Sequence, residues 1–164
     1  MKVNQDQFRE AMSRFATGVT VITVDDHGKV HGMTANAFAS VSLDPLLVLV
    51  CVDHSAQTHA HLETRKRFGV NVLAEEQSNL SEYFANPERF GSDPEVESQA
   101  RFDKTSHGTP VLHGALVYLE CRLRDAHEAG DHTVFIAEVE EIVIRPGAPL
   151  LYYGSRYRKL GPTV

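Results

Sequence analysis

Residues 32 to 58 read GMTANAFASVSLDPLLVLVCVDHSAQT, and this stretch decides the fold. It begins with small, hydroxyl-bearing and amide-bearing side chains, and after the turn signal Asp44-Pro45 it continues into the apolar run Leu46 to Val52. Ser55 follows, where we expect the N-cap of a helix. Small side chains let a flat ligand lie close to the backbone, and the amides at a helix start bind anions. The stretch therefore indicates a site for a planar, phosphate-bearing cofactor, although it contains no phosphate-loop or dinucleotide fingerprint.

Length and composition indicate one domain over residues 1–164. The chain has 42% hydrophobic residues, which argues against disorder, and its formal net charge of -6 argues against a nucleic-acid partner. The longest purely apolar run, Leu46 to Val52, is far shorter than the roughly 20 residues needed to span a bilayer. The polar N-terminus MKVNQDQFRE lacks an apolar signal region. We therefore expect a cytoplasmic protein that binds neither membrane nor nucleic acid.

Strand patterns outnumber helix patterns along the chain. Runs rich in β-branched or alternating apolar residues predict strands at residues 19–24, 46–52, 68–73, 115–123, 133–144 and 150–153. Helices are predicted at residues 4–15, 55–65 and 77–85. The sequence DDHGK at residues 25–29 predicts a hairpin turn. So many strands with short connections favour an antiparallel barrel, closed or split, although the pattern alone leaves a sandwich open.

The same patterns predict how these elements are buried. Residues 46–52 do not alternate, so we expect both faces of that strand to be covered, whereas residues 115–124 alternate and predict a half-buried strand that ends in a turn over residues 125–130. The apolar face of helix 4–15, capped by Asn4, is expected to pack on a sheet. Residues 86–110 are rich in Pro, Gly, Ser and charge, and predict a long surface loop.

Three motifs give the chain a recognisable family resemblance. They are Phe15-Ala16-Thr17-Gly18-Val19, the GMTAN and SVSLDP segments at residues 32–45, and Gly130-Asp131-His132. With these motifs the chain, from Phe8 to Leu160, resembles the flavin reductase family, the small reductase components of two-component flavin-dependent monooxygenases. The resemblance implies a mainly β fold, a split antiparallel Greek-key β-barrel with a few peripheral helices that assembles as a homodimer. It also implies hydride transfer from NADH or NADPH to FMN or FAD, with the reduced flavin passed to a separate oxygenase component.

The resemblance further implies three groups of flavin-binding residues. Those that match the segment lining the flavin ring are Thr34, Ala35 and Asn36. Those that match the edge of the ring and the ribityl chain are Ser40, Val41, Cys51 and Val52. Those that match the phosphate-binding turn are Ser55, Gln57 and Thr58. The alternative for the last group is a helix cap and nothing more, although capping and phosphate binding are compatible because both use the N-terminal amides of the helix.

Four other residues are candidates for the site. His132 matches the family's G-D-H, which implies a place beside the nicotinamide and an orienting or charge role; an ordinary histidine in a surface turn is the alternative. Tyr157 and Arg158 could flank the cofactor or belong to a solvated tail. Asn71 is an amide within an apolar run and must find a partner when buried. Neighbouring backbone and the flavin are both open as that partner.

Neither a disulfide nor a metal site is predicted. Cys51 and Cys121 form no CxxC pair and are expected to be small buried thiols. Among the nine histidines, His54, His59 and His61 are clustered, but His59 and His61 fall on different faces of their predicted helix.

Two alternatives to a reductase remain open at this point. One is a flavin-binding module for storage or sensing, built on the same barrel but without reductase turnover. The other is an oxidase of the related pyridoxamine phosphate type. The GMTAN and GDH segments favour the reductase over both.

Overall fold

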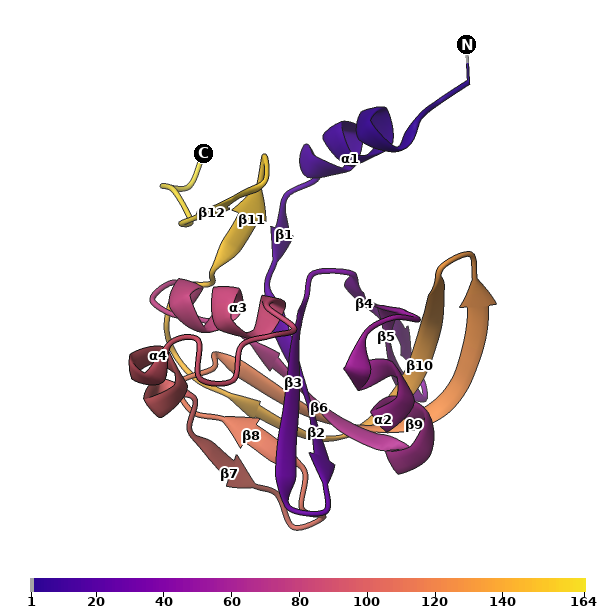
Figure 1. The fold of residues 1–164 in the computed structure, drawn as a ribbon, viewed down its shortest axis with the longest axis vertical. Helices are drawn as coiled ribbons and strands as arrows, with labels where there is room; N and C mark the ends of the chain where they lie inside the picture. The colour runs from indigo at the N-terminus through magenta and orange to yellow at the C-terminus, as the bar shows by residue number, and fades with distance from the viewer. Residues whose placement is uncertain (1) are drawn as a thin grey trace.

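A seven-stranded antiparallel sheet forms the centre of the fold in a computed structural model that describes residues 2–164 (Figure 1). The strands follow the order β3-β2-β6-β9-β10-β5-β4 across the sheet. In chain order they are β2 (Thr20–Asp26), β3 (Lys29–Ala35), β4 (Phe38–Leu43), β5 (Leu46–Asp53), β6 (Arg67–Val72), β9 (Val117–Ala129) and β10 (His132–Ile144).

The connection between β3 and β4 shows that this sheet is curled. These two strands lie at opposite edges of the sheet, yet only Asn36 and Ala37 separate them in the chain. Because so short a link spans at most about 11 Å, the two edges must curve toward one another. The sheet is therefore a barrel that stays open between its edge strands, and the predicted antiparallel, mainly β fold is confirmed.

Smaller elements surround the barrel. Two minor sheets contain the strands β1 (Thr17–Gly18), β11 (Leu151–Tyr153) and β12 (Arg156–Arg158), and the pair β7 (Phe102–Lys104) and β8 (Pro110–Leu112). The helices are α1 (Gln5–Ser13), α2 (Gln57–Arg65), α3 (Ser78–Ala85) and α4 (Pro94–Gln99). Among the described residues, no helix combines the length and the apolar character needed to cross a membrane.

The core consists of two apolar clusters that face different sides of the sheet's strands. One fills the barrel interior and includes Val50, Phe68 and Phe135. The other lies beneath α3 and includes Leu73 and Phe84. α3 therefore covers the barrel next to β3, the strand that carries the GMTAN segment.

Several local predictions were wrong. Residues 86–110 are not a loop, because they contain α4 and β7 and end at the first residue of β8. β9 continues to Ala129 because it keeps pairing with β10 up to the tight turn at Gly130, whose φ of 69° suits glycine. β9 is buried in its first half, where Tyr118 and Glu120 are fully inaccessible, whereas residues 124–129 are exposed.

Burial of β5 and α1 within the single chain is less than expected. β5 alternates, with Val48, Val50 and Val52 buried and Leu46 exposed. α1 has the predicted capping box between Asn4 and Gln7, but it buries no residue. Figure 1 shows this helix projecting from the barrel, so its apolar face does not pack on the sheet of its own chain.

Candidate functional site

Two adjoining pockets lie along β3, one on each half of the strand. The first, about 220 Å³, has a floor at residues 34–36 of the chain, and we call it the tyrosine pocket because Tyr152 and Tyr157 line it. The second, about 380 Å³, begins at residues 31–33 and is called the arginine pocket after Arg89. Both pockets also share Ala85 at the end of α3. We refer to these two adjoining pockets together as the groove along β3.

Hydrogen bonds fix the walls of the tyrosine pocket. The Thr34 hydroxyl donates to the Ser81 carbonyl over 2.6 Å, which ties β3 to α3. The Ser81 hydroxyl and the Tyr157 phenol lie 2.7 Å apart, and the Tyr152 and Tyr157 rings meet edge to face with centroids 5.5 Å apart. Burial raises the pKa of Tyr157, so the phenol stays protonated. The pocket therefore presents aromatic surface beside neutral hydroxyl groups.

Thr34, Ala35 and Asn36, which are predicted to line the flavin ring, lie together on the other side of this pocket. Thr34 and Ala35 are half-buried, and Asn36 is exposed at the end of the strand. Among residues 2–164, the Asn36 amide donates a single long hydrogen bond, 3.4 Å to the Thr17 hydroxyl. Its oxygen and a second N–H are thus open to a ligand in the pocket.

Arg89 is the most unusual group of the arginine pocket. It is only 6% exposed, and within the described residues no carboxylate lies at ion-pair distance from its guanidinium. The guanidinium instead lies over the rings of Phe84 and Phe90, 5.5 and 5.0 Å from their centroids, and donates a 3.3 Å hydrogen bond to the Asn86 carbonyl. Burial lowers the pKa of Arg89. A buried cation without a carboxylate is costly, so this position indicates an anionic ligand.

The N-terminus of α2 lies in the same pocket. Ser55, Gln57 and Thr58, which are predicted to form a phosphate-binding turn, all line this pocket. The predicted cap was wrong: Ala56 is the N-cap, no side chain caps the helix, and the Ser55 hydroxyl donates to Asp53 over 2.6 Å. Hydrogen bonds from the hydroxyl and the backbone amide of Ser55 lower the pKa of Asp53. The first amides of α2 are therefore without a side-chain cap at the positive end of the helix dipole, which suits a phosphate.

Sequence reasoning missed Arg89, because it falls in the segment predicted as a loop. The signal that could have found it is an arginine placed between two phenylalanines, Phe84 and Phe90, in an otherwise acidic stretch.

Other predicted cofactor residues lie outside the groove. Asn71 is fully buried, and its amide donates to the Val21 carbonyl and the Thr23 hydroxyl and accepts from the Leu112 amide. Both ends of the side chain are used, so the prediction of a flavin contact was wrong and the structural alternative holds. Val52 belongs to the barrel core and is equally removed from the groove.

The remaining four residues line neither pocket within one chain. They are Ser40, Val41, Cys51 and Arg158. Ser40, Val41 and Arg158 are exposed, and Cys51 is half-buried on β5 with a free thiol whose pKa is raised by burial. Cys121 is a free, fully buried thiol, as expected.

His132 lies at the start of β10, directly after the turn, and opens on a separate hollow. Its Nδ1 lies 2.7 Å from the Asp131 carboxylate, and this hydrogen bond lowers the pKa of Asp131. Residues of α1, including Phe8, line the hollow together with Asp53. Asp53 also lines the arginine pocket, so His132 lies next to the groove and not within it.

Comparison with known proteins agrees with this arrangement. The model of the flavin reductase like domain matches residues 12–161. An NADH-dependent flavin reductase of Rhodococcus sp is 41% identical over 155 residues, which cover 93% of this chain and 84% of that protein. An NADH-dependent FAD reductase of Streptomyces globisporus is 37% identical over 157 residues, which cover 95% of this chain and 86% of that protein.

Solved structures agree in fold as well. Flavin reductase PheA2 superposes with a TM-score of 0.90 at 41% identity, covering 98% of this chain and all of that one. The styrene monooxygenase flavin reductase of Pseudomonas putida S12 superposes with a TM-score of 0.86 at 37% identity, covering 96% of this chain and 99% of that one. With its curled antiparallel barrel, its groove along β3 and a family match over residues 12–161, the chain belongs to the flavin reductase like family.

Proposed function

We propose that this protein is an NADH:flavin oxidoreductase that transfers a hydride from the nicotinamide to FMN or FAD. The single observation that carries the proposal is the groove along β3. Its two ends differ in chemistry, with aromatic surface and the Asn36 amide at one end, and Arg89 and the start of α2 at the other. A planar ring joined to a phosphate has the same division into two ends.

The groove residues fit a flavin. In this proposal Thr34, Ala35 and Asn36 hold the ring, and Ser55, Gln57 and Thr58, with Arg89, hold the phosphate. Bound flavin supplies the hydride-accepting ring, so the protein has only to bind, orient and exclude water. The Asn36 amide would orient the polar edge of the ring, and Tyr152 and Tyr157 would shield the tyrosine pocket from solvent.

His132 would contact the nicotinamide nucleotide from the adjoining hollow. The hydrogen bond between Nδ1 and the Asp131 carboxylate orients the imidazole and leaves Nε2 available to a ligand. Because a direct hydride transfer requires no proton from the protein, we assign His132 an orienting role. NADPH is the alternative donor, and the relatives described above carry NADH in their names.

Reduced flavin would then pass to a separate oxygenase component. Relatives at 36% identity include the reductase subunit of a flavin-dependent monooxygenase from Rhodococcus jostii, and 98% of this chain is covered. Nicotinamide and flavin nucleotides are made inside cells, so the proposed reaction places the protein in the cytoplasm.

We further propose that the protein is a homodimer, because large apolar side chains are exposed on the single chain. Phe15 is 70% exposed next to α1, and Leu43 is 89% exposed on β4. An exposed apolar surface of this kind is typical of an interface. A second copy over β4 and β5 would also cover the outer face of β5 and bring Ser40, Val41 and Cys51 to an interface.

Light scattering after size exclusion tests the dimer. We expect twice the chain mass of 18.2 kDa for the wild type, and a monomer for Leu43→Glu. A wild-type monomer at micromolar concentration would contradict the dimer without affecting the proposed reaction.

The reductase is tested by NADH oxidation with and without added flavin. Oxidation that depends on FMN or FAD supports it. Flavin binding without oxidation of either nicotinamide would instead favour the binding module.

A further inference from the structure

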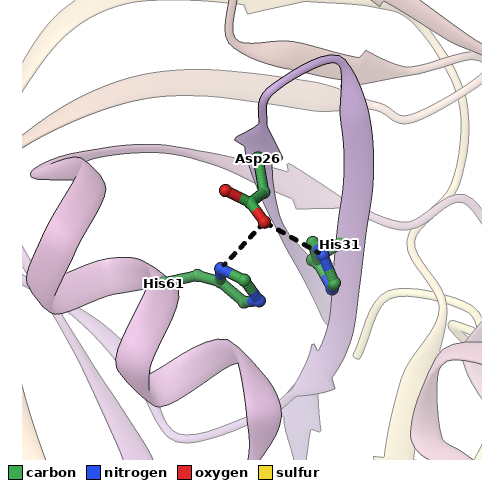
Figure 2. Close-up of side chains that lie close together, drawn as sticks. All are labelled: Asp26, His31 and His61. Carbon is green, nitrogen blue, oxygen red and sulfur yellow. Dashed lines mark ion pairs between the residues drawn. The ribbon is translucent and has the colours of Figure 1, made fainter.

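Three metal-ligating side chains converge next to the arginine pocket, as Figure 2 shows. Asp26 ends β2, His31 lies on β3 and His61 lies on α2. The Asp26 Oδ2 atom lies 3.9 Å from His31 Nε2 and 3.9 Å from His61 Nδ1. The two imidazole rings are stacked, with centroids 3.9 Å apart. Separations of this size are too long for hydrogen bonds, so none of the three groups satisfies another.

The three ligand atoms are close enough to share one metal ion once the stacked imidazole rings turn so that their nitrogen lone pairs face it. The three ligand atoms lie within 4.8 Å of one another, so a common point exists about 2.4 Å from each, a few tenths of an ångström beyond Zn–N and Zn–O bonds. Two imidazoles and one carboxylate form a donor set that zinc uses, with the fourth position left for water. We propose that Asp26, His31 and His61 bind a divalent transition-metal ion of the Zn²⁺ class.

The state of His31 is a second, independent observation. The residue is only 9% exposed, and its Nδ1 has no hydrogen-bond partner among residues 2–164. A metal on Nε2 would fix the proton on Nδ1, and an acceptor in the arginine pocket, which His31 also lines, could then receive it.

The charges around Asp26 leave one carboxylate oxygen for the metal. Arg65 donates to Oδ1, and His27 Nε2 lies 3.9 Å from the same oxygen. Oδ2 is the atom that faces both His31 and His61. Arg65 therefore orients the carboxylate from outside, in the way that outer hydrogen bonds orient the ligands of metal sites.

Such an ion would join β3 to α2 across the arginine pocket. His31 lines the pocket from β3, and Gln57 and Thr58 line it from α2. Metal binding would hold these two walls at a fixed separation and so be linked to flavin affinity. This linkage rests on the proposed function, whereas the metal site itself does not.

The test uses chelator-stripped full-length protein without flavin or nicotinamide, titrated with Zn²⁺ by calorimetry and with Co²⁺ by visible absorption. We expect one Zn²⁺ per chain, a raised melting temperature, and the absorption bands of tetrahedral Co²⁺. His61→Ala and His31→Gln should each weaken Zn²⁺ binding at least tenfold. The matched control is His127→Ala, which removes an exposed histidine that lies 3.1 Å from Asp125 and should bind Zn²⁺ like the wild type.

Three results would overturn the site. They are no saturable Zn²⁺ binding by the wild type, wild-type affinity in both His61→Ala and His31→Gln, and equal loss in His127→Ala. The second result would place the ion elsewhere, for instance at the exposed group formed by Asp53, Asp131 and His132. Circular dichroism of each variant establishes that it is folded, and two different ligand variants make the outcome independent of either one.

Discussion

Replacement of Arg89 by methionine tests whether this side chain binds the flavin phosphate, because we expect it to weaken FMN binding without much effect on the stability of the free protein. Methionine keeps much of the side-chain length and the contact with Phe84 and Phe90, but removes the charge. A hydrogen bond to a charged group contributes about 1.5–3 kcal/mol, so loss of the contact with phosphate should weaken FMN binding by roughly 10- to 150-fold. The free protein should not lose stability by more than about 1 kcal/mol, because a buried cation without a carboxylate is replaced by an apolar side chain.

The assay is fluorescence titration of Arg89→Met with FMN and with riboflavin, which lacks the phosphate. We expect a large loss for FMN and little change for riboflavin. Arg101→Met, an exposed arginine of the neighbouring segment, is the matched control and should bind both ligands like the wild type. Equal losses for FMN and riboflavin, or unchanged FMN affinity, would refute the assignment of Arg89 to the phosphate.

Three other variants test separate parts of the site and the core. Asn36→Ala should weaken FMN and riboflavin alike, by roughly 3- to 10-fold, because it removes a ring contact; unchanged affinity by titration would count against the ring site. His132→Ala should raise the Michaelis constant for NADH more than it changes flavin binding, and an effect on flavin alone would show that His132 is misplaced. Glu120 is buried, which raises its pKa, but hydrogen bonds from Thr109, His107 and Thr105 outweigh burial and lower the pKa overall. Ionised Glu120 therefore stabilises the folded protein at pH values above the pKa it has in the unfolded chain, and this stabilisation is lost as the pH falls through its lower pKa in the folded protein. Glu120→Gln should make the melting temperature fall less steeply below about pH 4.5. If the melting temperature of Glu120→Gln fell with pH as steeply as that of the wild type, carboxylates other than Glu120 would cause the loss of stability in acid.

The elements predicted well from the sequence are those fixed by local chemistry. The hairpin between β2 and β3 forms at DDHGK because its turn residues, His27 and Gly28, both have positive φ. The cap of α1 forms because Asn4 and Gln7 satisfy each other's backbone N–H groups. Both depend only on residues close in the chain.

The features that could not be predicted depend on distant surfaces. The apolar face of α1 has the period of a packed helix, but the period does not say whether its own chain or a second copy covers it. The Asn71 amide reads as a possible ligand contact until the Leu112 amide, 41 residues away, is found to fill its oxygen. Arg89 and the group of Asp26, His31 and His61 are likewise assembled only by the tertiary fold.

The most direct measurement follows the absorbance of NADH in the presence of the purified protein, with FMN, FAD or no flavin added. The proposed reaction predicts rapid NADH oxidation that requires a flavin and saturates with it, and the relative rates would rank FMN against FAD. No flavin-dependent oxidation of NADH or NADPH, under conditions where titration shows that flavin is bound, would contradict the reductase and leave a flavin-binding module.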